Sequence, residues 1–206
     1  MSLTHLSDNA LNIALRAAAR AVIQSLQAMP ELQGAKVAIV GGLAVQNYVK
    51  IKRRTLDVDV LLFRPDHPID TQWIRKELVS RFRKSFKACG QPLFFKYKCK
   101  GKRKGKRKGT RKGKLKAKPK CKRTYLVQVD IIPGYLPPYL PGNAMTLEDV
   151  NLKHLPFIAL LDLLAYKVHS SSMRSCPKKQ KQDAKDATRL WKTLYGQRYV
   201  PLSDGQ

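Results

Sequence analysis

Three aspartates stand inside segments whose other residues are typical of apolar β-strands. Asp57 and Asp59 lie in the segment 56–62, and Asp130 lies in the segment 127–132. Aspartate is depleted in strands, and residues i and i+2 project from the same strand face about 6.5–7 Å apart. Two such carboxylates can close on one divalent ion, or on a pair of ions about 3.5–4 Å apart. A buried cluster of carboxylates needs a cation to stay ionised, so these aspartates are candidate metal ligands.

A structural ion pair is the alternative explanation for an aspartate in a strand, because Arg53 and Arg54 lie close by in the sequence. The segment upstream favours a nucleotide site instead. Gly41 and Gly42 follow a predicted strand and open a predicted helix. Such a turn presents unpaired N–H groups and the positive end of a helix dipole to a phosphate. A glycine pair, the Asp-x-Asp pattern and a third strand aspartate are together more specific than any one of them.

These segments resemble motifs of the DNA polymerase β-like nucleotidyltransferase superfamily. The spacing is closest to that of the minimal nucleotidyltransferases of the AbiEii toxin type. The segments that carry the resemblance are 39–42 (Ile-Val-Gly-Gly), 54–59 (Arg-Thr-Leu-Asp-Val-Asp) and 129–131 (Val-Asp-Ile).

The resemblance implies a role for each matched residue. Gly41 and Gly42 cradle the phosphates of a nucleoside triphosphate, and Arg54 and Thr55 also belong to the nucleotide-binding motif. Thr55 departs from the pattern, because it follows Arg54 directly. The first two carboxylates, Asp57 and Asp59, bind the metal that carries the triphosphate, while Asp130 helps to bind the metal that activates the acceptor hydroxyl. The implied cofactor is a pair of Mg²⁺ ions, with Mn²⁺ as the alternative.

The C-terminal part is similar to a further pattern of the family, D-L-h-x-x-K…R…K-D-h-x-D-h. It implies that Lys167 contacts triphosphate or acceptor and that Asp183 orients it, both as catalytic residues. Gln182 stands where the pattern has a lysine. Periodicity independently places Lys167 on the helical face of Leu163 and Leu164, with its ammonium near buried surface. The alternative is that its long side chain reaches solvent.

The predicted fold class is mixed α/β (α+β), a small sheet flanked by helices and followed by a C-terminal helical lobe. Residues 1–140 are predicted to form the nucleotidyltransferase domain, and 141–206 a helical region that completes the active-site cleft. The Pro-rich stretch 133–141 is a predicted hinge or linker. Hydrophobic spacing and turn residues predict helices at 11–29, 43–50, 74–86, 156–172 and 179–195, and strands at 37–40, 56–63, 93–97 and 125–132.

Positive charge is concentrated in one segment of the chain. The 206 residues carry a formal charge of +27, of which the segment 96–123 supplies 17 basic residues and no acid, leaving +10 for the rest. This Gly-Lys-Arg repeat has almost nothing apolar, so it is predicted to be a disordered insert between two strands. Polycations bind nucleic-acid backbones by counterion release. The candidate nucleic-acid-binding residues are Lys102, Arg103, Lys104, Lys106, Arg107, Lys108, Arg111 and Lys112.

Targeting and cysteine patterns give weaker indications. The apolar stretch 155–166 falls short of the roughly 20 residues of a membrane span, and no membrane partner is expected. The segment 11–29 can imitate a mitochondrial leader, but an integral first helix is preferred. We expect a cytoplasmic protein, with 102–108 as an alternative nuclear-localisation signal. Cys99 and Cys121 bracket the insert and could bind zinc or form a disulfide, although free thiols are favoured.

Two functions from different classes fit these patterns. The first is a metal-dependent nucleotidyltransferase that moves a nucleoside monophosphate from an NTP to an acceptor hydroxyl and releases pyrophosphate. The acceptor is expected to be RNA, with a tRNA 3′ end as the leading candidate and protein modification left open. The second is a catalytically inactive RNA- or ribosome-binding protein that acts through the insert. An antitoxin-like protein partner stays open for both.

Overall fold

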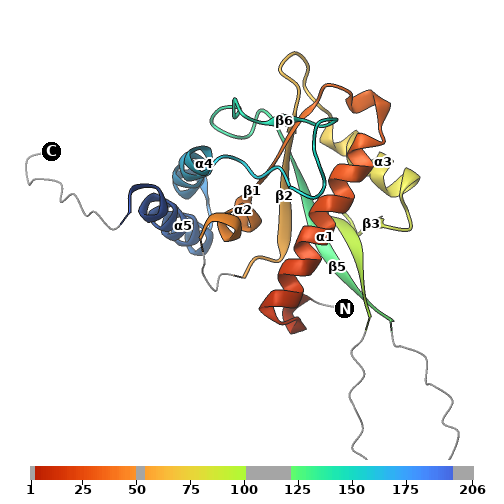
Figure 1. The fold of residues 1–206 in the computed structure, drawn as a ribbon, viewed down its shortest axis with the longest axis horizontal. Coiled ribbons are helices and arrows are strands. Elements are labelled where there is room, and N and C mark those ends of the chain that lie inside the picture. Colours follow the sequence, from red (N-terminus) through yellow and green to blue (C-terminus); the bar gives the residue numbers. More distant parts are fainter. Residues whose placement is uncertain (1–2, 50–53, 101–121, 197–206) are drawn as a thin grey trace, which may run out of the picture.

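A mixed sheet of six strands forms the centre of the protein (Figure 1). The computed structural model describes residues 3–49, 54–100 and 122–196. The strand order is β3-β4-β5-β2-β1-β6, in which β2 and β5 run parallel and the other neighbours run antiparallel. The elements are η1 (Leu3–His5), α1 (Asp8–Gln27), η2 (Pro30–Leu32), β1 (Lys36–Val40), α2 (Gly41–Tyr48), β2 (Asp57–Phe63), α3 (Thr71–Arg81), β3 (Phe86–Ala88), β4 (Leu93–Lys100), β5 (Lys122–Pro133), β6 (Met145–Thr146), α4 (Leu160–Met173) and α5 (Pro177–Tyr195).

Helix α1 covers one face of the sheet. The Ser7 hydroxyl caps its first turn by accepting from the Ala10 N–H at 3.4 Å, which satisfies one otherwise unpaired helix donor. The apolar stripe of α1 is buried, as the spacing predicts. It packs in one core with apolar residues of β2, β5 and α3. Every second residue of β2 points to this side, and Val58, Val60 and Leu62 therefore join this core.

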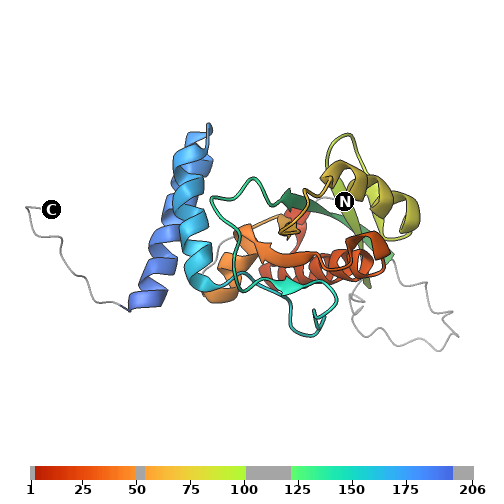
Figure 2. The same ribbon diagram turned by 90° about the horizontal axis from the view of Figure 1, so that it is seen from above.

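The other face of the sheet is covered by α2, α4 and α5. Leu61 and Phe63 of β2 pack there with Ile132 of β5. Because strand side chains alternate between faces, Asp57 and Asp59 must share this side with Leu61 and Phe63. Helices α4 and α5 stand side by side next to α2 (Figure 2). The strand aspartates and the C-terminal helices therefore lie on the same side of the sheet.

The predicted fold class, a mixed sheet with flanking and C-terminal helices, is confirmed. The bounds of the predicted helices shift by two or three residues at most ends, and two helices differ by more at one end. Phe86, expected on a helix with Ile74, lies in β3 beside Phe95 of β4, because α3 ends at Arg81. Helix α4 starts at Leu160, since the preceding backbone pairs with β1 through a bridge at Ile39 instead of forming a helical turn.

The predicted division at residue 140 stays a prediction, as does the hinge at 133–141. Strand β6 follows that position and pairs with β1, so the sheet is completed by residues of both predicted parts. Both ends of the predicted insert, 96–100 and 122–123, lie in the paired strands β4 and β5, so the prediction that these residues are disordered is wrong. Residues 101–121, which connect the two strands, lie outside the described residues. Within the described parts of the chain, no helix is long and apolar enough to cross a membrane.

Candidate active site

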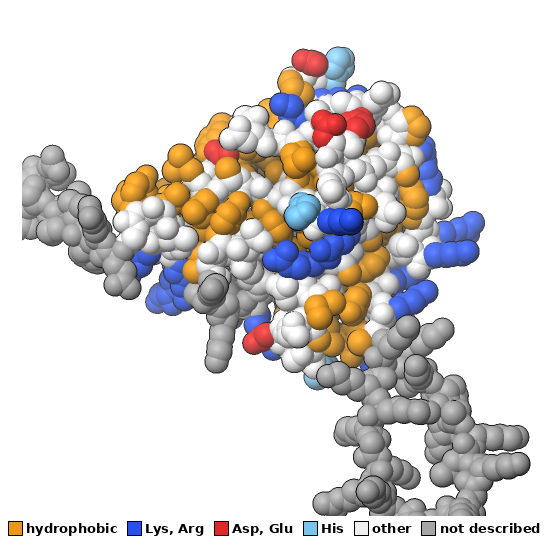
Figure 3. All heavy atoms as spheres, in the orientation of Figure 1, with side chains coloured by type: hydrophobic (Ala, Val, Ile, Leu, Met, Phe, Trp, Pro, Cys, Tyr) orange, Lys and Arg blue, Asp and Glu red, His pale blue; other side chains and the backbone are white. Residues whose placement is uncertain are grey.

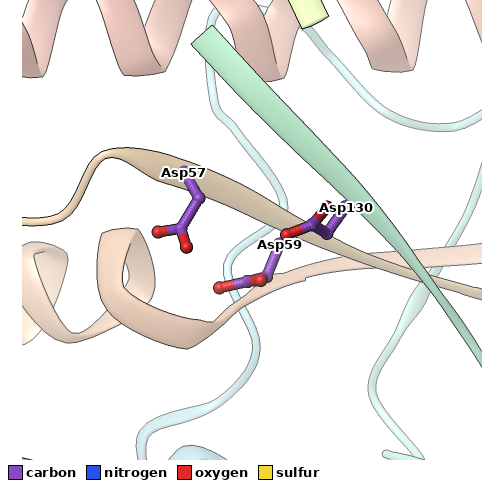
Figure 4. A group of neighbouring side chains, drawn as sticks. All are labelled: Asp57, Asp59 and Asp130. Atoms are coloured by element: carbon purple, nitrogen blue, oxygen red, sulfur yellow. The ribbon is translucent and has the colours of Figure 1, made fainter. Parts of the chain in front are cut away.

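Three carboxylates from two neighbouring strands meet at one end of the sheet (Figure 4). Asp59 of β2 stands opposite Asp130 of β5 in the parallel register, and Asp57 stands opposite Gln128. One carboxylate oxygen from each of Asp57, Asp59 and Asp130 lies within 4.8 Å of the others. This separation allows the three side chains to share one metal ion, and oxygen donors of this kind suit hard divalent cations.

Two neighbouring polar side chains hold the outer carboxylates in place. The hydroxyl of the buried Thr55 donates to Asp57 Oδ1 at 2.7 Å. The Gln128 amide donates to both oxygens of Asp130, at 3.1 and 3.0 Å. Gln128 was absent from the predicted site, although its position two residues before Asp130 on one strand face was a signal for it. Each hydrogen bond limits the rotation of one aspartate side chain and so fixes the direction in which its carboxylate points.

Gly41 is the point where β1 turns into α2 against the carboxylates. Its φ is +64°, a conformation that glycine adopts without strain. A Cβ atom at this position would lie 1.7 Å from Asp59 Oδ2. The next residue, Gly42, donates its backbone N–H to the Asp59 carboxylate. The glycine pair therefore brings the N-terminus of α2 directly onto the central aspartate.

Asp59 is the electrostatic centre of the site. Burial, followed by repulsion from Asp57 and Asp130, raises its pKa to about 7, although Lys167 and the Gly42 N–H act in the opposite direction. Three carboxylates at such separations cannot all ionise freely without a compensating positive charge. The arrangement therefore favours either a bound cation or a shared proton.

Lys167 connects the C-terminal helices to this cluster. Its side chain is buried, with 6% of the residue exposed, and its ammonium donates to Asp183 Oδ1 at 2.6 Å. Arg174 donates to the other oxygen of Asp183 at 3.0 Å. Burial opposes ionisation of Asp183, but these two cations outweigh it and hold the pKa of the carboxyl below its usual value. The predicted pairing of Lys167 with Asp183 is thus present, and the ammonium also acts on Asp59.

Asp186 is a further member of this network that the predicted site left out. It is fully buried and lies 3.9 Å from the Lys167 ammonium, while Gln182 donates to its Oδ1 at 2.9 Å. The second aspartate of the family pattern was the signal that could have identified it. Gln182, where the pattern has lysine, thus serves as a partner of Asp186.

Arg54 contacts the N-terminal segment of the chain. Its guanidinium donates to the Leu6 carbonyl at 2.9 Å and forms an ion pair with Asp8 at 3.4 Å. It therefore fastens the N-terminal segment to the start of β2, and the alternative pairing of Arg54 with a strand aspartate is wrong. The candidate nucleic-acid-binding residues 102–112, together with Arg53 and Cys121, lie outside the described residues.

Comparison with known proteins supports the fold. No protein-family model matches the chain, and no curated protein matches it. Among solved structures, the chain is similar to an antigenic nucleotidyltransferase-like protein from Paracoccidioides brasiliensis, with a TM-score of 0.53 and 18% sequence identity. The similarity covers 90% of this chain and 77% of that chain. The protein thus has a nucleotidyltransferase-like fold, as predicted, while the closer resemblance to the AbiEii type stays a prediction.

Proposed function

We propose that the protein is a metal-dependent nucleotidyltransferase. It transfers a nucleoside monophosphate from an NTP to an acceptor hydroxyl, so that a new O–P bond forms at the α-phosphorus and pyrophosphate leaves. The observation that carries this proposal is the convergence of Asp57, Asp59 and Asp130 within 4.8 Å on two adjacent parallel strands. The nucleotidyltransferase-like fold supports it.

The residues of the site fit a divalent metal. Their donors are carboxylate oxygens, which Mg²⁺ and Mn²⁺ prefer, and the raised pKa of Asp59 means that Lys167 and the Gly42 N–H do not fully offset burial and repulsion within the cluster. We assign Asp57 and Asp59 to the ion that accompanies the triphosphate, and Asp130 to a second ion near the acceptor. When bound, such ions supply neutralisation of the charge on the phosphates and alignment of the reacting oxygens.

The other residues of the site position the substrates. The backbone of Gly41 and Gly42, free of side chains, lets a phosphate approach the start of α2. Lys167 would contact the triphosphate or the acceptor, and Asp183 holds its ammonium in place. Thr55 keeps Asp57 in a fixed rotamer. For Arg54, the contacts with the N-terminal segment favour a structural role in place of nucleotide binding.

RNA is the acceptor that the charge of the chain favours. The segment 96–123 contributes 17 basic residues without an acid, and such a segment binds phosphate backbones without reading sequence. A tRNA 3′ end, with its free hydroxyl, is the leading candidate. The same charge favours a second function, that of a catalytically inactive RNA- or ribosome-binding protein.

The direct test is incorporation of label. The purified protein is incubated with each α-³²P-labelled NTP, Mg²⁺ and total RNA, and the labelled product is identified on a gel. We expect one NTP to label a discrete RNA, and Asp57→Ala with Asp59→Ala to abolish the label. Asp66→Asn, which changes an exposed acid outside the site, is the matched control and should keep full activity. Undiminished labelling by the double variant would overturn the proposal, and absence of label with every NTP would favour the binding function.

A further inference from the structure

The solvent-facing side of α5 carries a row of basic and aromatic residues with one threonine among them. Its members recur at alternating intervals of four and three residues, which places them on one face of a helix. Each member is exposed to solvent. We call this the α5 outer face, and its residues are Lys181, Lys185, Thr188, Lys192 and Tyr195, with Trp191 beside Tyr195.

The charged residues of the α5 outer face are all lysines. The only two acids of α5, Asp183 and Asp186, are on the opposite side of the helix, where they are buried and paired with cations. Among the ion pairs of the described residues, none involves an exposed lysine of α5. Like charges at these intervals repel one another within a helix. A row of unneutralised lysines is therefore complementary to a polyanion.

Trp191 and Tyr195 form an exposed aromatic pair at the end of this row. Their ring centroids are 4.1 Å apart with an interplanar angle of 38°, and each residue is 52% exposed. Lys192 lies between them in the sequence. Figure 3 shows apolar side chains gathered on the side of the molecule that carries α4 and α5, with basic side chains at the lower edge. Two large exposed rings beside lysines are unusual on a surface that only contacts water.

We propose that the α5 outer face binds a single-stranded polynucleotide. The lysines would contact successive phosphates, and the two rings would stack against unpaired bases, a combination typical of proteins that bind single strands. A duplex hides its bases from such rings, and an acidic protein, which would match the lysines, is distinguished from a polynucleotide by the competition experiment below. This surface extends the proposed function by giving a nucleic-acid acceptor a docking site, but binding to it does not require turnover.

The α5 outer face differs from the basic insert in what it can recognise. The insert, 96–123, has 17 basic residues and few aromatic ones, so it attracts backbone charge alone. The rings of α5 add contacts to bases, which the insert cannot supply. Helix α5 has 19 residues, a length of about 28 Å, and so spans several nucleotides.

The chain offers an internal probe for this interaction. It has two tryptophans, so Trp73→Phe leaves Trp191 as the single tryptophan of the protein. The full-length Trp73→Phe protein is titrated with oligouridylate and oligodeoxythymidylate of about 12 nucleotides, and binding is followed by fluorescence anisotropy of the labelled oligonucleotide and by Trp191 emission. We expect both oligonucleotides to quench Trp191, because stacking on a base quenches the indole. The oligonucleotide that binds with the lower Kd identifies RNA or DNA as the preferred ligand.

Matched variants separate this surface from general electrostatics. Lys185→Gln with Lys192→Gln removes two charges from the α5 outer face, while Lys76→Gln with Lys84→Gln removes two exposed charges elsewhere. We expect the first pair to weaken binding about fivefold and to lower the salt slope by about 1.4, and the second pair to have a smaller effect. Trp191→Leu should weaken binding of single strands about tenfold and leave duplex RNA unaffected.

Three results would overturn the proposal: unchanged Trp191 emission at saturating oligonucleotide, equal weakening by the two lysine pairs, or competition by polyglutamate as strong as that by RNA. Failure of the proposed catalysis would look different. The variant Asp57→Ala with Asp59→Ala should show the same quenching as its parent. If RNA quenches Trp191 emission but the protein transfers no label to RNA, binding at the α5 outer face is supported and the proposed enzymatic function is wrong.

Discussion

At Gly41, the absence of a side chain decides whether the central carboxylate has room. The residue has a φ of +64°, and a Cβ atom there would lie 1.7 Å from Asp59 Oδ2. The backbone of β1 and the carboxylate of β2 can therefore approach only because this position is glycine. The Gly42 N–H that follows donates to the same carboxylate, so the glycine pair shapes the candidate metal site as well as the predicted phosphate cradle.

Substituting alanine at Gly41 tests this close approach. Gly34→Ala is the matched control, because Gly34 also has a positive φ, +77°, but a Cβ there would meet nothing within 4 Å. Both variants incur the left-handed strain of about 1–2 kcal/mol. We expect Gly41→Ala to lose more unfolding free energy than Gly34→Ala in urea titrations, and to lose Mg²⁺-dependent stabilisation. Equal losses in both variants would show that Asp59 does not depend on this glycine.

At the scale of elements, the parallel pair β2 and β5 assembles the carboxylates. Asp59 and Asp130 stand directly opposite each other, and both face the side of the sheet that α2, α4 and α5 cover. Because this environment raises the pKa of Asp59 to about 7, the folded protein binds a proton that the unfolded chain has released above its ordinary pKa of 3.8. The site is thus destabilising at neutral pH unless a cation is bound.

The stability of the metal-free protein should consequently fall as pH rises from about 4 to about 7. Over this window the unfolded state holds fewer protons than the folded state, and the loss attributable to Asp59 is at most about 4 kcal/mol. We expect urea titrations in EDTA at pH 5 and pH 8 to show about 3 kcal/mol of this loss in the wild type and a smaller loss in Asp59→Asn. Mg²⁺ at pH 8 should restore stability to the wild type alone. An identical pH profile for both proteins would contradict the assignment.

The helix pair α4–α5 contributes a buried ion-pair network. Lys167 reaches Asp183 at 2.6 Å and Asp186 at 3.9 Å, so its removal would leave the two buried carboxylates with only the largely exposed arginines as cationic partners. We expect Lys167→Met to lower the free energy of unfolding by about 3 kcal/mol, and Lys153→Met, at an exposed position, to change it little. Adding Asp183→Asn to Lys167→Met should recover part of the loss in chemical denaturation. No recovery would mean that packing, and not charge, dominates.

At the scale of the whole molecule, the residues that flank the segment 101–121 belong to two neighbouring strands of the sheet. Strands β4 and β5 pair along their length to Lys100 and Lys122, and a two-residue Asn-Gly turn is a common closure for such a hairpin. The three carboxylates and the C-terminal helices lie in the segments 54–100 and 122–196. A short turn from Lys100 to Lys122 should therefore leave the pairing of β4 with β5 in place.

Replacing residues 101–121 with Asn-Gly therefore distinguishes an enzyme from a binding module. We expect the shortened protein to keep its melting temperature and its nucleotidyl transfer to a small acceptor, while its affinity for RNA and the salt dependence of that affinity fall. Filter binding over a salt series and the labelling assay measure the two properties separately. Joint loss of binding and of transfer to a small acceptor, in a protein that still melts cooperatively, would favour the binding function.

Local patterns determined the elements and the candidate chemistry. The two-residue alternation of a strand put Asp57 and Asp59 on one face, and helical spacing buried α1 and the Lys167 side of α4, because these periods depend on neighbours in the chain. The same spacing was misleading at Phe86, where pairing with β4 overrides a helical pattern.

Only the tertiary structure decided which distant residues meet. The parallel register that sets Asp59 against Asp130 joins strands separated by the insert, and no local period contains that pairing. The roles of Gln128 and Asp186 and the contact of Arg54 with Asp8 depend in the same way on contacts between elements. The sequence alone thus determined which carboxylates could bind a metal, whereas their convergence, and the exposure of an unpaired cationic face on α5, follow from long-range packing that no local pattern encodes.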